Sequence, residues 1–324
     1  MTSPLVSIIL PNYNHAHFLN KRIDSILQQT YQNFELIILD DCSTDYSAEI
    51  IKSYLPSKKI SHTIFNEKNS GSTFLQWQKG FSFAKGKYVW IAESDDYSDL
   101  TFLEKMVSLL ENNEDCCIAF CHSHLIDEND KILDLDWDRN SQQYATALLM
   151  DSQEFVEKRM LFDNSIYNAG MVVFRRSSLE KIGNGYAEYK FCGDWYLWKE
   201  LCLQGATVIR LSEKLNYFRQ HQSKVSPKAV LEGLSFTEGK YIFKDTLERL
   251  NYSLLKKRVA IGYFLKRIRL RTKYFKDKAT KTRVYLDSKE FLRGSYADVV
   301  FYKADRKLFK CRFSGLNIEK NWLF

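Results

Sequence analysis

Long apolar runs are missing from this chain of 324 residues, although 45% of its residues are hydrophobic. No stretch approaches the roughly 20 apolar residues that a helix needs to span a bilayer, and residues 1–5 lack the charged and apolar parts of a signal peptide. The hydrophobic content is nevertheless sufficient for a large buried core. These features predict a globular protein that resides in the cytoplasm.

Paired cysteine motifs and the common phosphate-binding loops are also missing. The seven cysteines are odd in number and form no CxxC unit, which predicts reduced thiols and disfavours a disulfide framework or a structural zinc site. Neither GxxxxGK[ST] nor GxGxxG occurs. A phosphate-loop NTPase and an NAD(P) dehydrogenase are therefore disfavoured.

The formal net charge of +7 hides an acidic body and a basic tail. Residues 240–324 contain 23 Lys and Arg against 8 Asp and Glu, whereas residues 1–239 contain 24 against 32. An acidic body suits a site that uses a cation, and a basic tail suggests a polyanionic neighbour such as an anionic membrane surface. A solvated helical surface, an oligomer contact and nucleic-acid binding are the alternatives for the tail.

Strand and helix patterns alternate along the first part of the chain. The predicted strands are Val6–Pro11, Phe34–Asp40, His62–Phe65, Tyr88–Ala92 and Cys117–His122. The predicted helices between them are Phe18–Gln29, a helix capped by Ser43 or Thr44 and running to about Leu55, Phe74–Ala84 and Leu103–Leu110. This alternation is typical of an α/β fold with a doubly wound, mainly parallel sheet.

The second part of the chain is less regular. An irregular segment through about Met150 is expected to hold a substrate loop. It is followed by a strand at Met171–Phe174, a helix at Asp194–Leu203 and a strand at Ala206–Leu211. Helical periodicity dense in Lys and Arg begins near Val230. We therefore predict two domains, 1–230 and a basic, mainly helical region 231–324.

Acidic residues follow two of the predicted strands. Asp40-Asp41 ends one strand, and Glu93-Ser94-Asp95-Asp96 follows another. Ligands of open α/β sheets bind beyond the carboxyl ends of such strands, and crowded carboxylates repel one another unless a cation shares them. Asp95 and Asp96 are thus placed to hold magnesium or manganese against a diphosphate. The alternatives are a helix cap at Asp40 and a solvated loop at Glu93–Asp96.

Four motifs occur in order between about residues 5 and 225. They are VSIILPNYNHAHFL, LIILDDCSTD, NSGS with a following QWQKG, and KYVWIAESDDY. Together they resemble the inverting family 2 glycosyltransferases with a GT-A fold. That resemblance implies a Rossmann-like, mixed and mainly parallel sheet flanked by helices. The chain has no QxxRW motif, which favours single-sugar addition over processive synthesis.

The resemblance also implies roles for individual residues. They are Pro11, Asn12 and Tyr13 at the nucleoside, Asp40 at its base, Asp95 at the ribose or metal, Asp96 at the metal, Asp194 as the catalytic base, and Arg219 and His221 near the diphosphate and metal. Glu93 stands where many relatives have Asp, and Gly193 where many have Glu. For Asp194 a helix N-cap is the alternative role. Trp77, Trp90, Trp195 and Trp198 are expected in the core, with a sugar-stacking surface as the alternative.

The expected function is therefore transfer of one sugar from a nucleotide-diphosphate sugar, UDP-linked by resemblance, to an acceptor hydroxyl with inversion. A divalent cation, manganese or magnesium, is the expected cofactor. The expected acceptor is a glycan or lipid-linked glycan in cell-surface polysaccharide or glycolipid assembly. The basic region is expected to make peripheral contact with the inner face of the membrane, and no nucleic-acid partner is expected. The rival is a non-catalytic sugar-nucleotide or glycan-binding protein on the same fold.

Overall fold

A computed structural model describes residues 5–135, 137, 147–221, 225–295, 297–300 and 302. The chain forms two compact units. The first contains residues 1–153, 166–190 and 197–222, and the second contains residues 154–165, 191–196 and 223–324. Two short segments upstream of residue 223 thus belong to the second unit. The predicted division into domains at residue 230 stays a prediction.

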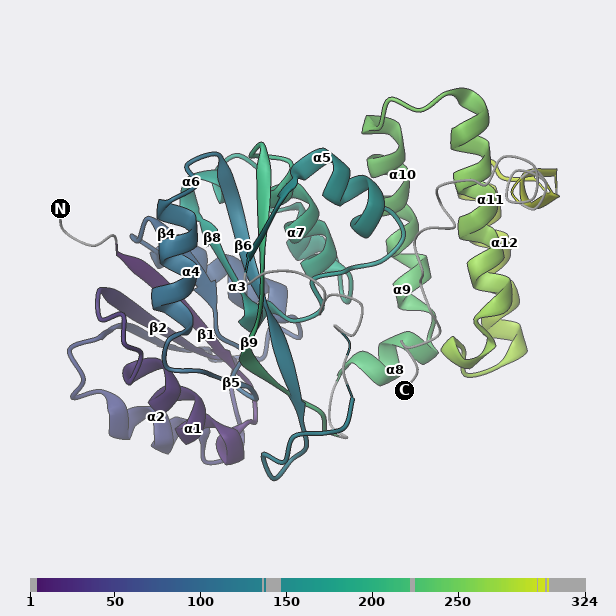
Figure 1. The fold of residues 1–324 in the computed structure, drawn as a ribbon. Helices are drawn as coiled ribbons and strands as arrows, with labels where there is room; N and C mark the ends of the chain where they lie inside the picture. The colour runs from purple at the N-terminus through teal and green to yellow at the C-terminus, as the bar shows by residue number, and fades with distance from the viewer. Residues whose placement is uncertain are drawn as a thin grey trace. The chain divides into compact units, whose positions relative to one another are not determined.

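The first unit is built on one mixed sheet, which has nine strands in the part of the chain that the structure describes (Figure 1). The strand order is β3-β2-β1-β4-β8-β6-β9-β5, and β7 pairs with β9. The strands are β1 (Val6–Asn12), β2 (Phe34–Asp40), β3 (Ile60–Phe65), β4 (Tyr88–Ile91), β5 (Tyr97–Ser98), β6 (Cys116–Ile126), β7 (Ala147–Asp151), β8 (Val172–Arg175) and β9 (Thr207–Arg219). Strands β1 to β4 are mutually parallel, as are β6 and β9, whereas β5, β7 and β8 are antiparallel to their neighbours.

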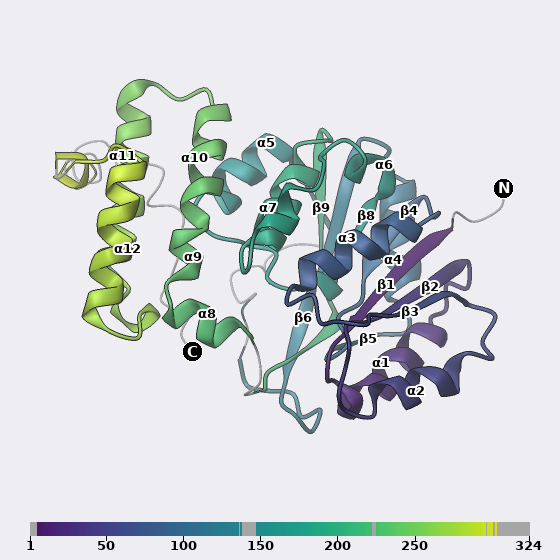
Figure 2. The ribbon, with the colours of Figure 1, turned by 180° about the vertical axis from the view of Figure 1, so that it is seen from behind.

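Helices cover both faces of this sheet, which explains why β1, β2 and β4 are buried along their whole length and mostly apolar. Helices α1 (Ala16–Leu27), α2 (Ser47–Tyr54) and α4 (Phe102–Glu111) lie on one face, and α3 (Thr73–Phe83) lies on the other (Figures 1 and 2). Helix α3 approaches β1 closely because Gly80 has no side chain: a Cβ there would lie 2.3 Å from Ile9 Cγ2. The predicted α/β fold is confirmed.

Further short elements lie in both units. They are α5 (Ser152–Phe155), the π-helix η2 (Val156–Met160), the 3₁₀-helices η3 (Ala169–Met171) and η4 (Gly185–Glu188), α6 (Arg176–Leu179) and α7 (Gly193–Cys202). The π-helix η2 lies in the second unit, and the residues of α5 and α7 are divided between the two. Trp77, Trp90, Trp195 and Trp198 are all at most 4% exposed. The core interpretation of these tryptophans is therefore correct, and the sugar-stacking alternative is wrong.

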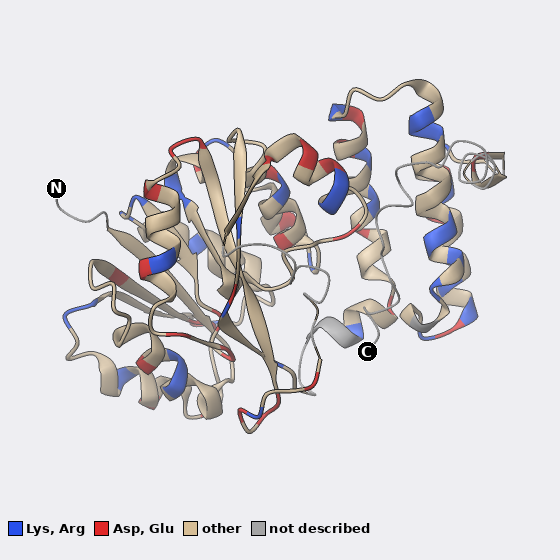
Figure 3. Ribbon diagram, in the orientation of Figure 1, with Lys and Arg blue, Asp and Glu red and all other residues tan. Residues whose placement is uncertain are grey.

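The second unit is helical, as predicted for the C-terminal region. It contains α8 (Val225–Leu231), α9 (Leu234–Thr237), α10 (Gly239–Arg249), α11 (Leu254–Leu270), η5 (Thr272–Tyr274) and α12 (Lys278–Phe291). Phe162, Phe243 and Phe264 belong to its apolar core. Lys and Arg recur along α10, α11 and α12 (Figure 3). None of the described helices is long and apolar enough to cross a membrane.

Three elements differ from the sequence prediction. The strand expected at Ala206–Leu211 runs on to Arg219, because β9 pairs along its length with β6, β7 and β5. The segment expected to be irregular contains the end of β6 and all of β7, while residues 138–146 lie outside the described residues. Helix α2 begins at Ser47 with Tyr46 as its N-cap, and not after Ser43 or Thr44, because Ser43 is bonded to Asp40 and Thr44 to Asn14.

Candidate active site

The carboxyl ends of β1, β2 and β4 lie side by side. Asn12 is paired in register with Asp40, and Ala92 N–H donates to Ile9 O at 2.7 Å just beyond β4. The Asn12 side chain donates to Asp40 Oδ2 at 2.8 Å, and Ser43 donates to the same carboxylate through its amide and its hydroxyl. Asp40 is 2% exposed, so its carboxylate organises this turn. It does not cap α2, whose N-cap is Tyr46.

The neighbouring residues of the predicted nucleoside pocket differ in exposure. Pro11 is buried within β1, whereas Tyr13 directly follows the strand and is 46% exposed. Asp41 lies at the end of β2 and accepts hydrogen bonds from Ser70 and from the Gln76 amide at 2.9 Å. This carboxylate thus ties the NSGS and QWQKG motifs to the end of the sheet.

Asp96 joins three separate parts of the first unit. Its Oδ1 accepts the backbone N–H of Arg219 at 2.7 Å, and its Oδ2 accepts the Asn168 amide at 2.7 Å. The residue is 1% exposed. Both carboxylate oxygens are therefore engaged in holding the end of β9 and the loop before β8. Its predicted role as a metal ligand stays a prediction.

Arg219 holds the acidic motif from the other side. Its Nε donates to Asp95 O at 2.7 Å, its Nη1 to Asp127 O at 2.8 Å, and its Nη2 to Asp130 Oδ1 at 2.6 Å. The guanidinium also lies over the Phe18 ring, 4.4 Å from its centroid. All three nitrogens thus bond to the protein, and the predicted contact of Arg219 with a diphosphate stays a prediction.

His15, Asp95 and His221 form the one potential metal-binding cluster among the described residues. One ligand atom from each lies within 4.8 Å of the others. His221 Nε2 lies 2.9 Å from Asp95 Oδ2, and His15 Nδ1 shares a hydrogen bond of 2.8 Å with Ser94 Oγ. The structure thus brings together two predicted residues, Asp95 and His221. It adds His15, which the sequence prediction missed. The position of His15 shortly after β1 was the feature of the sequence that could have indicated it.

The donor set of this cluster fits a divalent cation. Adjacent octahedral ligands, each about 2.1 Å from a cation, lie about 3 Å apart, close to the separation of Asp95 and His221. Two imidazoles and one carboxylate suit manganese better than magnesium, because magnesium prefers oxygen ligands. Asp95 and His221 therefore fit the predicted cation, with His15 as a third ligand.

A buried arginine lies beneath the acidic motif. Arg22 is fully buried in α1, donates to Ser98 Oγ at 2.9 Å, and lies 5.0 Å from the Trp90 ring centroid. Burial lowers the pKa of Arg22 to about 10, against the opposing effect of the carboxylates of Asp96, Glu93 and Asp95. The sequence prediction missed Arg22 because a helix pattern does not reveal which charge turns inward.

Glu93 is the carboxylate most affected by this crowding. Burial, together with the charges of Asp95 and Asp96, raises the pKa of Glu93 to about 8, although the hydrogen bond from the Trp77 indole and the charge of Arg22 oppose this shift. The indole N–H of Trp77 donates to Glu93 Oε1 at 2.9 Å. Glu93 therefore interacts with the site through α3 and through the shared charge of the motif, and it is not a member of the metal-binding cluster.

Asp194 belongs to the second unit, in the first turn of α7. Its Oδ1 accepts the backbone N–H of Trp195 at 2.7 Å, and its Oδ2 accepts the Asn164 amide at 2.8 Å. Burial raises the pKa of Asp194 to about 7, while these two hydrogen bonds lower it and the charge of Glu238 raises it. A carboxylate with such a pKa is suited to general-base catalysis near neutral pH.

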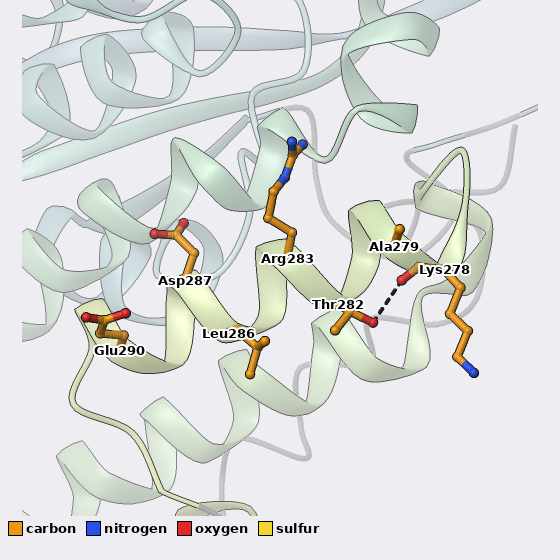
Figure 4. A pocket seen from close by; sticks show the side chains of 7 residues that line it. All are labelled: Lys278, Ala279, Thr282, Arg283, Leu286, Asp287 and Glu290. Carbon is orange, nitrogen blue, oxygen red and sulfur yellow. Dashed lines mark hydrogen bonds between the residues drawn. The ribbon is translucent and has the colours of Figure 1, made fainter.

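A shallow groove of about 860 Å³ lies along α12 (Figure 4). Its lining residues are Lys278, Ala279, Thr282, Arg283, Leu286, Asp287 and Glu290. All of them come from this one helix, and none is a predicted site residue. The groove is therefore an open helix surface, and we assign it no part in catalysis.

Replacing Arg22 with Met is expected to destabilise the protein by about 3 kcal/mol at pH 8, since it removes the buried partner of several carboxylates. Because the pKa of Glu93 is already raised, the folded state binds protons more tightly than the unfolded state, and stability falls as pH rises from about 4.5 through about 8. Loss of Arg22 is expected to raise the pKa of Glu93 further, so that the free energy of unfolding falls more steeply with pH.

Urea unfolding at pH 5 and pH 8 measures this effect. The matched control is Arg175→Met, because Arg175 donates chiefly to backbone carbonyls, including Cys116 O at 2.7 Å. Its loss of stability is expected to be similar at both pH values. Equal losses at pH 5 and pH 8 for Arg22→Met would contradict the charge-compensating role.

Solved structures show the same fold. The crystal structure of S. aureus TarS residues 1–349 in complex with UDP-GlcNAc superimposes with a TM-score of 0.70 at 17% identity, covering 96% of this chain and 87% of that chain. The complex with UDP gives a TM-score of 0.61 at 19% identity, covering 83% and 72%. At these identities the likeness concerns the fold, and the expected GT-A fold is confirmed.

Sequence relatives show the family. TuaG of Bacillus subtilis, whose name refers to teichuronic acid biosynthesis, is 33% identical over 131 residues, which are 40% of this chain and 51% of that protein. An uncharacterized glycosyltransferase of Rickettsia typhi is 31% identical over 232 residues, which are 70% and 68%. The chain spans 42% to 51% of the length of the first four curated relatives it matches. The model of glycosyl transferase family 2 matches residues 7–183, and the chain belongs to this family.

Proposed function

We propose that this protein transfers a single sugar from a UDP-sugar to an acceptor hydroxyl with inversion of the anomeric configuration. The observation that carries the proposal is the cluster of His15, Asp95 and His221. These residues follow strands of the same sheet in which Asn12 and Asp40 end the neighbouring strands β1 and β2. The TarS complexes with UDP and UDP-GlcNAc support a UDP-sugar donor, and the name of TuaG supports a place in cell-surface polysaccharide or glycolipid assembly.

The nucleoside is assigned to the ends of β1 and β2. Tyr13 offers an exposed ring beside the buried pair Asn12 and Asp40, which suits stacking against a planar base. Pro11 keeps the end of β1 rigid. Arg219 is assigned first to positioning Asp95 and Asp96, since it bonds to both residues. A direct contact of Arg219 with the diphosphate is the weaker assignment.

Asp95 and His221, with His15, would hold the divalent cation. When bound, such a cation neutralises charge on the departing diphosphate. The protein's own contribution here is to keep three ligand atoms within 4.8 Å of one another. Asp96 is assigned to positioning this set, because its two oxygens accept hydrogen bonds from Arg219 and Asn168.

Asp194 is assigned the general base. The acceptor oxygen forms a bond to the anomeric carbon while the bond from that carbon to the diphosphate oxygen breaks, and UDP leaves with the bonding electrons. Asp194 takes the proton of the acceptor hydroxyl in this step. Because attack and departure occur on opposite faces of the carbon, one displacement inverts its configuration. A non-catalytic binding protein would need no such base.

The proposed acceptor is a lipid-linked glycan at the inner face of the cell membrane. The support is the basic character of the second unit, where Lys278 and Arg283 are exposed on α12. Each Lys or Arg near an anionic surface contributes about 1 kcal/mol to binding.

Replacing Asp194 with Asn is expected to lower turnover by at least about a hundredfold, the effect of losing a general base. The preferred donor is first identified by measuring the hydrolysis of several UDP-sugars with manganese and without acceptor. Turnover of Asp194→Asn is then measured with that donor. UDP affinity, measured by calorimetry, is expected to remain within about twofold of the unmodified protein. If the unmodified protein hydrolyses none of the donors, the alternative function, a non-catalytic sugar-nucleotide or glycan-binding protein, is favoured.

The pH profile of turnover provides a second test of the base. Asp194 must be ionised to accept a proton, so activity is expected to rise with pH through about 7, the raised pKa of this residue. The exposed Asp115, changed to Asn, serves as the control and is expected to leave rate and profile unchanged. Wild-type turnover in Asp194→Asn would show that another group is the base.

Replacing Asp95 or His221 with Asn is expected to weaken manganese binding at least about tenfold, because each change removes a ligand. Electron paramagnetic resonance of free manganese measures this without nucleotide. His15→Asn is expected to weaken binding less, and the exposed His17, changed to Asn, is the matched control. Unchanged manganese affinity in Asp95→Asn and His221→Asn would contradict this cation site.

Flotation with liposomes tests the membrane assignment. The protein is expected to float with vesicles that contain phosphatidylglycerol, less so as salt rises, and not with neutral vesicles. Lys278→Glu combined with Arg283→Glu is expected to reduce binding about tenfold or more. Equal flotation with anionic and neutral vesicles would overturn the electrostatic contact.

A further inference from the structure

The two upstream segments of the second unit carry the residues that contact Asp194. Residues 154–165 include Asn164, which donates to Asp194 Oδ2, and residues 191–196 include Asp194 itself and Trp195. The family model ends at residue 183, so helices α9 to α11 lie beyond it. The contacts of these helices with the two segments therefore involve residues that the family model does not match.

Arg267 of α11 fixes the first segment. The side chain is 5% exposed, donates through Nη1 to Phe162 O, and forms an ion pair through Nη2 with Asp163. The Phe162 ring stacks on Phe243 of α10, with centroids 5.4 Å apart. Since Asn164 directly follows Asp163, these contacts fix the backbone that presents the Asn164 amide to Asp194.

Glu238, between α9 and α10, fixes the second segment. Its Oε2 accepts the backbone N–H groups of Phe191 at 2.9 Å and Cys192 at 2.8 Å, three and two residues before Asp194. Hydrogen bonds to a carboxylate are stronger than those to a neutral acceptor. Glu238 thereby orients the chain as it enters α7.

Trp195, in the second segment, contacts both α10 and the first segment. A Cβ at Gly239 would lie 2.7 Å from Trp195 Cζ3, so only glycine lets the backbone of α10 approach this indole so closely. The indole N–H donates to Met160 O at 2.8 Å in the first segment. Each segment is thus bonded to the C-terminal helices and to the other segment.

We propose that the C-terminal helices position the base of the sugar transfer, with Arg267 and Glu238 as its positioning residues. This inference depends on the proposed role of Asp194. Both carboxylate oxygens of Asp194 are held, one by each segment's donor, at 2.8 Å from Asn164 and 2.7 Å from Trp195 N–H. A displacement of about 1 Å in such a group can lower turnover about a hundredfold.

Fold stability alone gives a weaker account of the buried Arg267. A buried ion pair adds little to stability, and apolar replacements are often neutral or stabilising. The core around α11 already contains Phe162, Phe264 and Ile268. A methionine at position 267 could extend this core, whereas it could not hold Phe162 O and Asp163 in fixed places.

The test compares Arg267→Met and Glu238→Gln in the full-length chain with two matched controls. Arg269→Met changes an exposed arginine of α11, and Glu248→Gln changes an exposed glutamate of α10. Both positioning variants are expected to lower kcat for the preferred UDP-sugar by about 10- to 100-fold, with UDP affinity within about twofold of wild type. Arg267→Lys, which retains a charge opposite Asp163, is expected to recover part of the loss.

Hydrogen exchange reports the position of the segments independently of activity. Residues 160–165 are expected to exchange faster in Arg267→Met, and residues 191–196 in Glu238→Gln, with no change in the controls. Wild-type kcat in both positioning variants would overturn the proposal. So would an equal loss of kcat and UDP affinity, since that is the signature of general destabilisation.

Asn164→Ala keeps the test decisive if a positioning variant fails to fold. The Asn164 amide lowers the pKa of Asp194, so its loss is expected to move the acid limb of the turnover profile to higher pH. The other groups that affect this pKa are the backbone N–H groups of Trp195 and of Asp194 itself, which lower it, and the Glu238 carboxylate, which raises it. An unshifted limb with unchanged kcat would overturn the proposal.

The failure of this proposal can be distinguished from failure of the proposed base. If Asp194→Asn keeps wild-type turnover, the assignment of the base is wrong and the positioning proposal fails with it. If Asp194→Asn loses turnover while Arg267→Met and Glu238→Gln keep it, the base stands and only the positioning proposal fails.

Discussion

The paired hydrogen bonds of the Asp96 carboxylate are the interaction on which the proposed donor site depends. One oxygen accepts the Arg219 backbone at the end of β9, and the other accepts Asn168 before β8. Asp96 follows β4, so three chain segments far apart in sequence meet at one carboxylate. With Arg219 fixed, His221 lies two residues further on and reaches Asp95. Such a carboxylate can remain buried because its partners satisfy it and Arg22 supplies opposing charge.

The sequence allowed the fold and the general location of the site to be predicted, because both follow from local patterns. Apolar strands followed by Asp40 and by Glu93–Asp96 indicate where the sheet ends and where its ligand binds. The different contacts of Asp95 and Asp96 could not be predicted in this way. They depend on the register of β9 against β5 and β6, which brings Arg219 to one carboxylate and His221 to the other. His15 and Arg22, at the start of α1 and within it, escaped prediction because a local pattern does not reveal which polar side chain turns toward the acidic motif.

The basic C-terminal region has two kinds of charge, which composition alone cannot separate. Lys278 and Arg283 face solvent, as expected for a surface that meets an anionic partner. Arg267 and Lys240 are buried at 5% and 3% exposure and pair with Asp163 and Asp287. Through Arg267 this region supports residues 154–165, whereas the ion pair of Lys240 with Asp287 lies within the C-terminal helices. A membrane role and a structural role are therefore compatible, because different arginines and lysines carry them.

The central claim is that Asp95 and His221, and not Asp96, hold the cation of a nucleotide-sugar site. Anomalous diffraction at the manganese edge from crystals grown with manganese and UDP tests it most directly. The account predicts a single strong peak bonded to Asp95 and His221, with Asp96 still accepting hydrogen bonds from Arg219 and Asn168. A peak bonded to Asp96 but not to His221 would contradict it.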